Sequence, residues 1–316
     1  MGTSHVPFQR STSPSMYQLD EIYMTKIHIV TDSAAYFIDP THAARVTTVP
    51  MTIELGGRRY REGIDISSEE ALKIMSKQTT APRIIPPSVA DYIAIYGNLA
   101  QHYDAIISIH ASRELLGSWQ NARAAAQQVG HSKIMVFDSQ SICASQGMLI
   151  ADALQYIDDG VDPDELIRLL RGTTERLYSV YYVENVGYLH QNQIMSPAHA
   201  ILGAILGIKP FMALEEGELR LIEKVRTRTQ AIERMVEFVI EFTDIEHALI
   251  LQPRSTITEQ TRLLQDRLSV EFPGMTFEYG IYNTSLGALI GADATGIVIL
   301  ERELEYYGDG DDDYED

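Results

Sequence analysis

The sequence predicts an α/β protein built from two domains. Its 316 residues are enough for two domains with sizeable cores. From residue 26 onward, short segments rich in β-branched residues alternate with amphipathic helical segments. This alternation predicts βαβ units, and a polar break at 160–165 divides it. We therefore expect residues 25–160 to form a mostly parallel sheet flanked by helices, and residues 161–305 to form a mixed sheet with helices.

The expected N-terminal domain has four strands and four helices. The strands are expected at residues 26–32, 45–55, 104–112 and 133–139. The second of them contains Pro50, which has no N–H to donate and so belongs at a sheet edge or a bulge. The helices are expected at residues 67–78, 86–103, 117–130 and 145–160. The first of these begins with a capping serine followed by glutamates, which is a typical helix start.

The expected C-terminal domain mixes hairpin and crossover signals. Residues 208–225 predict a β-hairpin that turns at Glu216 and Gly217. The other strands are expected at residues 178–184, 247–252, 276–282 and 296–302. Helices are expected at residues 163–176, 196–207, 228–243 and 258–270. A hairpin beside strand–helix–strand units predicts a mixed sheet.

Charge and composition exclude several classes of function. The formal net charge of -19 repels phosphate backbones and anionic lipid headgroups, so we expect neither nucleic-acid binding nor membrane insertion. No run of 18 apolar residues is present. The single cysteine, Cys143, allows no internal disulfide and is interpreted as a packing residue. These features are typical of a cytoplasmic protein.

The two ends of the chain are expected to lie outside the folded domains. Residues 1–24 contain no apolar signal segment and are interpreted as a disordered arm. Residues 306–316 form an acidic tail, which is expected to be solvated and disordered. The tail lacks the turn glycine and the closing glutamate of a calcium loop, so we expect no metal there.

No catalytic or cofactor signature is present in the sequence. It contains no G-x-S-x-G elbow, P-loop, H-E-x-x-H or C-x-x-C motif, and its glycines do not match a dinucleotide fingerprint. The nine histidines are scattered, so no zinc site and no cofactor are expected. His110 lies within a buried strand pattern and is interpreted as a core histidine. Lys224, Arg226 and Arg228 could form a partner surface, although a solvated face is the simpler interpretation.

Polar residues gather where several expected strands end. They are Thr31, Asp32 and Ser33 after the first strand, Ser112 after the third, and Asp138 and Ser139 after the fourth. Asp and Ser also cap helices and stabilise turns, so each position alone says little. The carboxyl ends of strands in an open α/β sheet are where ligands bind, so their joint placement favours a ligand crevice.

Several stretches, in order, resemble the DegV family of bacterial fatty-acid-binding proteins. They include "IVTDSAAYF", "VTTVPMTIELGGRRYREGIDIS", "LLGSWQNARAAA", "VFDSQSICASQGMLI" and "VGYLHQNQIMSPAHAILGAILGIKPFM". The resemblance covers roughly residues 26 to 302. It implies two α/β domains that enclose a fatty acid in a cleft between them, without catalysis. It also implies a partner kinase that phosphorylates the fatty acid's carboxylate.

This sequence departs from the family pattern where the carboxylate is expected to bind. Ile84 and Ile85 replace a Thr-Ser pair, and Leu116 replaces the Ser of L-S-G-T. Ile194 stands for an Arg, and Asp293 for a His. Without these hydroxyls and this cation, and with Asp293 repelling a carboxylate, a neutral alcohol or ester head fits better. The usual kinase partnership is therefore in question.

The resemblance implies a site whose lining residues can be named. Ile84, Ile85, Leu116 and Ile194 are expected to line its wall, with Gly117 in the turn beside them. Ser33 and Ser118 are its remaining polar candidates, and Asp293 could accept a hydrogen bond from a neutral head. The expected ligand is a fatty acid or a related acyl lipid. A collapsed cavity in a structural or interaction protein is the alternative, since the same isoleucines and leucine suit a closed core. An esterase would need a histidine beside Ser33, Ser112 or Ser118, and no motif suggests one.

Overall fold

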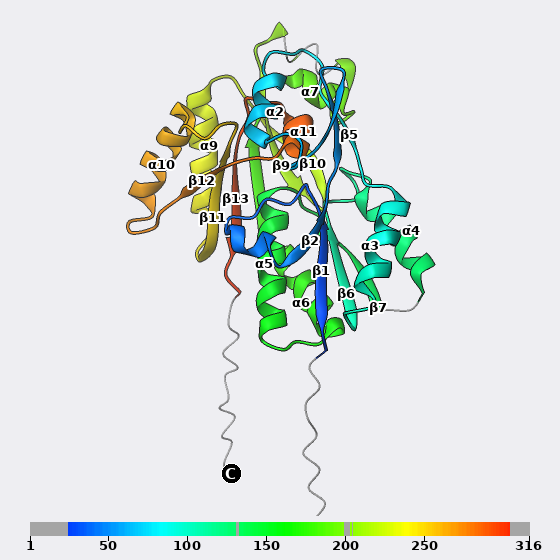
Figure 1. Cartoon of the computed structure of the whole chain (residues 1–316). Coiled ribbons are helices and arrows are strands. Elements are labelled where there is room, and N and C mark those ends of the chain that lie inside the picture. The colour runs from blue at the N-terminus through cyan, green and yellow to red at the C-terminus, as the bar shows by residue number, and fades with distance from the viewer. Residues whose placement is uncertain (1–24, 131–132, 199–202, 204, 304–316) are drawn as a thin grey trace, which may run out of the picture.

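The computed structural model describes residues 25–130, 133–198, 203 and 205–303. Helices and sheets alternate in layers, so that a parallel sheet and a mixed sheet lie on either side of a central helical layer (Figure 1). The expected two-domain α/β fold is therefore confirmed. The arm at 1–24 and the tail at 306–316 lie outside the described residues, and so does part of the helix expected at 196–207.

The parallel sheet belongs to the N-terminal half of the chain. Its order is β2 (Val46–Val49), β1 (Ile27–Asp32), β6 (Ala105–His110) and β7 (Lys133–Asp138). All three pairings are parallel. Helices α3 (Val89–Leu99) and α4 (Ser118–Val129) cover one face, while α5 (Ala144–Asp158) and α6 (Pro163–Glu175) cover the other. Both faces are apolar, which suits a buried parallel sheet.

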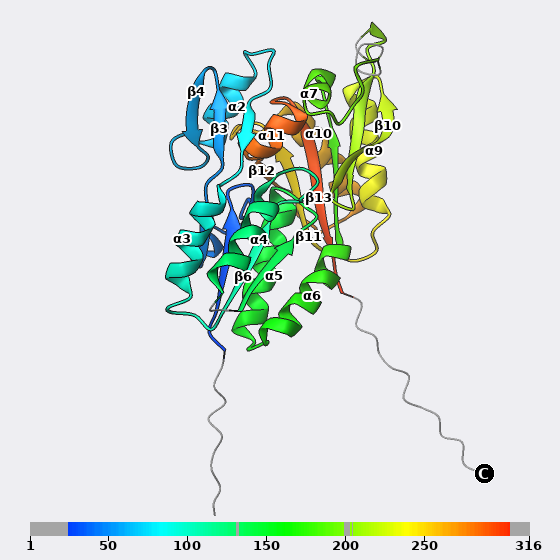
Figure 2. The same cartoon turned by 90° about the vertical axis from the view of Figure 1, so that its right-hand side faces the viewer.

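The mixed sheet belongs to the C-terminal half. Its order is β10 (Glu218–Val225), β9 (Lys209–Glu215), β8 (Leu177–Tyr182), β13 (Thr295–Glu301), β11 (Ile245–Gln252) and β12 (Glu278–Ile281). Only β11 and β12 pair in parallel, joined through α10 (Glu259–Glu271). Helices α9 (Arg228–Ile240) and α10 cover the outer face. Figure 2 shows α9 and β10 at the side of the molecule away from α3.

Helix α5 lies between the two sheets and joins their cores. Leu149 and Ala153 pack on the parallel sheet. Ala144 and Met148 pack instead into the large cluster that covers the inner face of the mixed sheet. Helix α6 packs with α5 through Leu166 and Leu170, which belong to the core of the parallel sheet. The domain boundary predicted at residue 160 stays a proposal. The packing of α6 on the parallel sheet favours a boundary at the end of α6 instead.

The prediction of a single strand at 45–55 is wrong. The segment forms two strands, β2 in the parallel sheet and β3 (Thr52–Leu55) in a small antiparallel sheet of order β4 (Arg58–Arg61), β3, β5 (Arg83–Ile85). Pro50 lies between them, and the next amide, that of Met51, donates to Ser33 Oγ at 2.9 Å. Because proline cannot donate to a ladder, the chain leaves one sheet there and enters the next.

Several short elements were not predicted from the sequence, whereas the hairpin was. Helices α1 (Pro40–Ala43), α7 (Val186–Gln191) and α11 (Thr284–Ile290) are too short to show a helical period, and β4 and β5 were also not expected. Helix α2 (Ser68–Met75) begins at the expected serine cap. The β9–β10 hairpin turns at Glu216 and Gly217, whose φ angles are 52° and 84°. Positive φ at both residues is what a tight type I′ turn requires, and the expected turn is confirmed.

Candidate functional site

An apolar cavity of about 290 Å³ opens beside the β9–β10 hairpin. Its described walls come from the start of α7, from the segment that follows α7, and from the hairpin itself. They are Val186, Ile194, Met195, Ser196, Gly203, Ile208, Pro210, Met212, Leu221 and Lys224. A volume near 300 Å³ is at the lower end for small-molecule sites, which run from roughly 300 to 1,000 Å³. The cavity can therefore enclose part of a long acyl chain.

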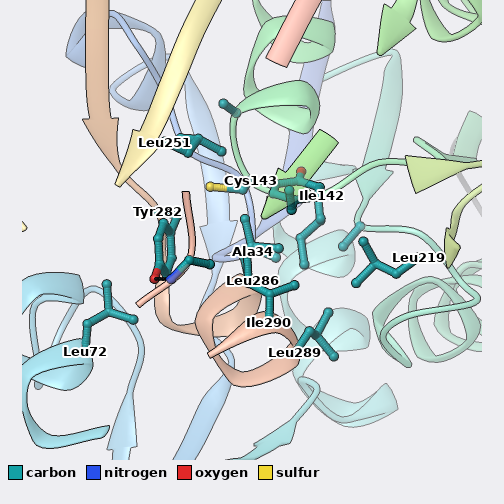
Figure 3. Close-up of a cluster of buried hydrophobic side chains, with 14 of the residues drawn as sticks. Ala34, Leu72, Ile142, Cys143, Leu219, Leu251, Tyr282, Leu286, Leu289 and Ile290 are labelled. Atoms are coloured by element: carbon teal, nitrogen blue, oxygen red, sulfur yellow. Dashed lines mark hydrogen bonds between the residues drawn. The ribbon is translucent and has the colours of Figure 1, made fainter. Parts of the chain in front are cut away.

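The cavity adjoins the central hydrophobic cluster between the two sheets. Met212 belongs to that cluster, and Ile194 and Met195 pack against it. Figure 3 shows another part of the cluster, where Cys143 and Ile142 lie beside Ala34 and above the side chains of α11. Burial raises the pKa of the Cys143 thiol to about 12, so it stays protonated and unreactive. Cys143 is thus a packing residue, as expected.

The expected wall residues occupy two different environments. Ile194 lines the cavity directly. Leu116 is 8% exposed and belongs to the central cluster, and Ile84 packs against the same cluster. Ile85 is half-buried on β5 opposite Thr52. The structure therefore fills the neighbourhood of Leu116 with side chains, while the space beside Ile194 stays open.

Gly117 and Ser118 begin helix α4. A Cβ on Gly117 would meet the Pro86 ring at 3.1 Å, so the glycine allows these two segments to pack closely. Ser118 is fully buried, and its hydroxyl points to the Met51 sulfur at 3.5 Å. Neither residue is among those that line the apolar cavity. Their role at a ligand stays a prediction.

Ser33 holds a buried carboxyl group that sequence reasoning missed. Ser33 Oγ donates to Glu62 Oε2 at 2.7 Å, and Glu62 is 3% exposed. The Ser285 amide and hydroxyl, at the start of α11, also donate to Glu62, each at 2.7 Å. Glu62 thus ties the end of β1 to the C-terminal half. The available signal was the acidic residue within the quoted stretch "YREGIDIS".

Burial raises the pKa of Glu62 to about 7, against 4.5 for an ordinary glutamate. The folded state therefore keeps this proton to a higher pH than the unfolded chain does. Its contribution to stability is full below pH 4.5 and is lost as the pH rises through about 7. Between these limits the loss is about 2–4 kcal/mol.

The Glu62→Gln variant should escape this loss. As the pH rises from about 4.5 to about 8, we expect wild type to lose about 2–4 kcal/mol of unfolding free energy that Glu62→Gln keeps. Urea unfolding at a series of pH values measures the difference. Glu271→Gln, at an exposed position, is the control and should show no such trend. Parallel pH profiles for wild type and Glu62→Gln would contradict the assignment.

The polar residues at the strand ends do meet at one edge of the parallel sheet. Asp32 Oδ2 lies 3.0 Å from His110 Nδ1, and the Ser139 amide donates to the His110 carbonyl at 3.1 Å. The Ser112 amide donates to the Ser141 carbonyl at 2.8 Å. These groups are satisfied within the protein. The expected gathering is confirmed: Asp32, Ser112 and Ser139 build turns and a buried network, whereas Asp138 lines an open pocket of about 890 Å³.

The buried network contains a serine, a histidine and an aspartate in hydrogen-bonded order. His110 Nε2 lies 2.7 Å from Ser108 Oγ, which in turn lies 2.7 Å from the Tyr96 hydroxyl. Asp32 also accepts from the Ala111 amide and from the Gln146 side chain. Asp32, Ser108 and His110 all have 0% exposure, so a substrate cannot reach the hydroxyl. The interpretation of His110 as a core histidine is confirmed.

Asp293 lies in a separate, polar cavity of about 270 Å³. Arg228, Arg254 and Glu259 share that cavity with it, and Asp293 is exposed. Its charge contributes, after burial, to raising the pKa of Tyr188. Asp293 is not among the residues that line the apolar cavity, so its carboxylate does not face a ligand bound there.

Within residues 25–130, 133–198, 203 and 205–303, no group of three or more His, Cys, Asp or Glu side chains could hold a metal ion. In that same part of the chain, the helices are too short or too polar to cross a membrane.

Comparison with known proteins gives consistent matches. A family model described as an uncharacterised protein of the DegV family matches residues 26–302. A DegV domain-containing protein of Listeria monocytogenes is 27% identical over 277 residues, which is 86% of this chain and 97% of the relative. The structure of DegV from Bacillus subtilis, described as a fatty acid binding protein, is 26% identical with a TM-score of 0.76, covering 88% of this chain and 100% of that one. A fatty acid binding DegV family protein from Streptococcus agalactiae has a TM-score of 0.80 at 23% identity, with 88% and 100% covered.

Proposed function

Because this chain belongs to the DegV family, we propose that it is a non-catalytic protein that encloses the chain of a fatty acid or related acyl lipid. The apolar cavity beside the β9–β10 hairpin is the observation that carries the proposal. The solved Bacillus subtilis relative, described as a fatty acid binding protein, supports it. We expect the protein to act in the cytoplasm.

The energetics of such a site are simple. Each methylene group that leaves water contributes about 0.8 kcal/mol, so burial of several methylene groups in an apolar cavity gives useful affinity. The described lining includes Ile194, Met195, Ile208 and Met212, whose flexible or branched side chains adapt to a hydrocarbon. The nucleophile candidates give no support to an enzyme. Ser112 and Ser118 are fully buried, and the Ser33 hydroxyl donates to Glu62.

Native mass spectrometry of the protein purified from bacteria tests the proposal. We expect one acyl lipid per chain, seen as a mass increment that is lost after delipidation and restored by adding palmitate or hexadecanol. A protein that is empty on purification and takes up neither lipid would favour the interaction module instead.

A kinase partner belongs to the proposal only if the lipid carries a carboxylate. The family resemblance suggests a fatty-acid kinase, while Ile84, Ile85 and Leu116 lack the hydroxyls expected to present the carboxylate. Phosphate transfer from ATP to protein-bound palmitate by a bacterial fatty-acid kinase would demonstrate this partnership. Absence of transfer, with palmitate shown to be bound, would exclude that kinase.

A further inference from the structure

The apolar cavity has a cation at its rim. Lys224 is the one charged side chain among the described residues that line it, and Lys224 is exposed. Leu221, on the same strand, is 40% exposed, so the cavity reaches solvent on the β10 side. An ammonium group at the open end of an apolar cavity is suited to an amphipathic ligand with an anionic head.

A β-bulge brings Lys224 to the cavity. In a regular strand, residues three apart point to opposite faces, so Leu221 and Lys224 could not line the same space. The register of β10 against β9 shifts between Leu221 and Glu223, with Leu221 opposite Met212 and Lys224 opposite Pro210. The extra residue, Ile222, resets the alternation and turns both side chains to one face. Bulges commonly redirect a side chain beside a functional site.

The ammonium group of Lys224 is available for a ligand. Neighbouring charges on the hairpin are already paired: Glu223 with Arg234 at 2.9 Å, and Lys209 with Glu184 at 3.2 Å. Within the described residues, no carboxylate lies at ion-pair distance from Lys224, and the residue opposite it in the ladder is Pro210. The contrast with Lys209 shows that the hairpin pairs one of its lysines internally and leaves the other at the rim.

We propose that the ligand is an anionic acyl lipid whose carboxylate pairs with Lys224 at the rim, while its chain runs inward past Ile194 and Met212. This inference rests on the proposed function and adds the orientation and the charge of the ligand. The opposite end of such a chain meets the central hydrophobic cluster, to which Met212 belongs and against which Ile194 packs. The polar end of the site thus lies at Lys224, and a methyl end faces the apolar cluster.

The test compares palmitate with hexadecanol in binding titrations at about pH 8, where a carboxylate is ionised. In Lys224→Met, the apolar stem is kept and the charge is removed. We expect the affinity for palmitate to fall about tenfold, as for loss of one charge-assisted hydrogen bond, with the affinity for hexadecanol unchanged. Arg226→Met removes an exposed cation that does not line the cavity and should leave both affinities unchanged. Thermal unfolding of each variant confirms that it is folded.

The outcomes separate this inference from the function on which it rests. If wild type binds palmitate and Lys224→Met binds it equally well, the orientation is overturned while lipid binding stands. Equal losses for palmitate and hexadecanol also overturn it, because they would assign Lys224 to the shape of the cavity. If wild type binds neither lipid, the proposed function fails and the inference fails with it.

Discussion

The Gly147→Ala variant is expected to lose roughly 3 kcal/mol or more of unfolding free energy, or to fail to fold. A Cβ at this position in α5 would lie 1.8 Å from the Tyr36 carbonyl oxygen and 2.7 Å from its carbon. The Tyr36 segment cannot retreat easily, because its amide donates to the Cys143 carbonyl at 3.0 Å and the Cys143 amide donates to the Ala34 carbonyl at 2.8 Å. Helix α5 is the layer shared by both sheets, so the damage should reach both domains.

Gly172→Ala in the neighbouring helix α6 is the matched control. This glycine is exposed, and a Cβ there would meet nothing within 4 Å. Alanine should therefore stabilise the helix by about 0.5–1 kcal/mol. Urea unfolding followed by circular dichroism measures both variants. Equal effects of the two substitutions would contradict the tight packing of α5 against the Tyr36 segment.

The Ile194→Trp variant is expected to lose most of its affinity for lipid. In Ile194→Trp, the indole should occupy the cavity and displace three or four methylenes of the ligand. At about 0.8 kcal/mol each, this lowers lipid affinity roughly a hundredfold. Displacement of a fluorescent fatty acid measures the change. Tryptophan in place of Val270, which is 72% exposed on α10, adds the same bulk away from the cavity and should have no effect.

An Ile194→Trp protein that is folded and binds lipid as well as wild type would move the ligand elsewhere. A loss confined to Ile194→Trp, with Val270→Trp unchanged, would place the chain between α7 and the hairpin.

Much of the fold could be predicted from the sequence, because its strands and longer helices carry strong local signals. The hairpin turn at Glu216 and Gly217 follows from its residue types, and helices α2 and α3 follow from their serine caps and apolar spacing. The split of residues 45–55 at Pro50 into two sheets could not be predicted, since proline marks a break without indicating where the chain continues. Helices of six or seven residues, such as α7 and α11, show too little period to be recognised.

The site was predicted only in part, because cavities and buried charges depend on contacts between distant segments. Ile194 lies at the cavity, yet Leu116, named for the same wall, lies in the packed cluster. The buried carboxylate of Glu62 accepts a hydrogen bond from Ser285, which is 223 residues away in sequence. Lys224 faces the cavity only because the strand bulges at Ile222, and strand alternation alone would turn it away.

The most direct test of the central claim is a crystal structure of the protein loaded with an acyl lipid. We predict continuous density for one hydrocarbon chain along Ile194, Met195 and Met212, with its head toward Lys224. An interior packed by side chains alone in that region, in protein that had been saturated with lipid, would contradict it.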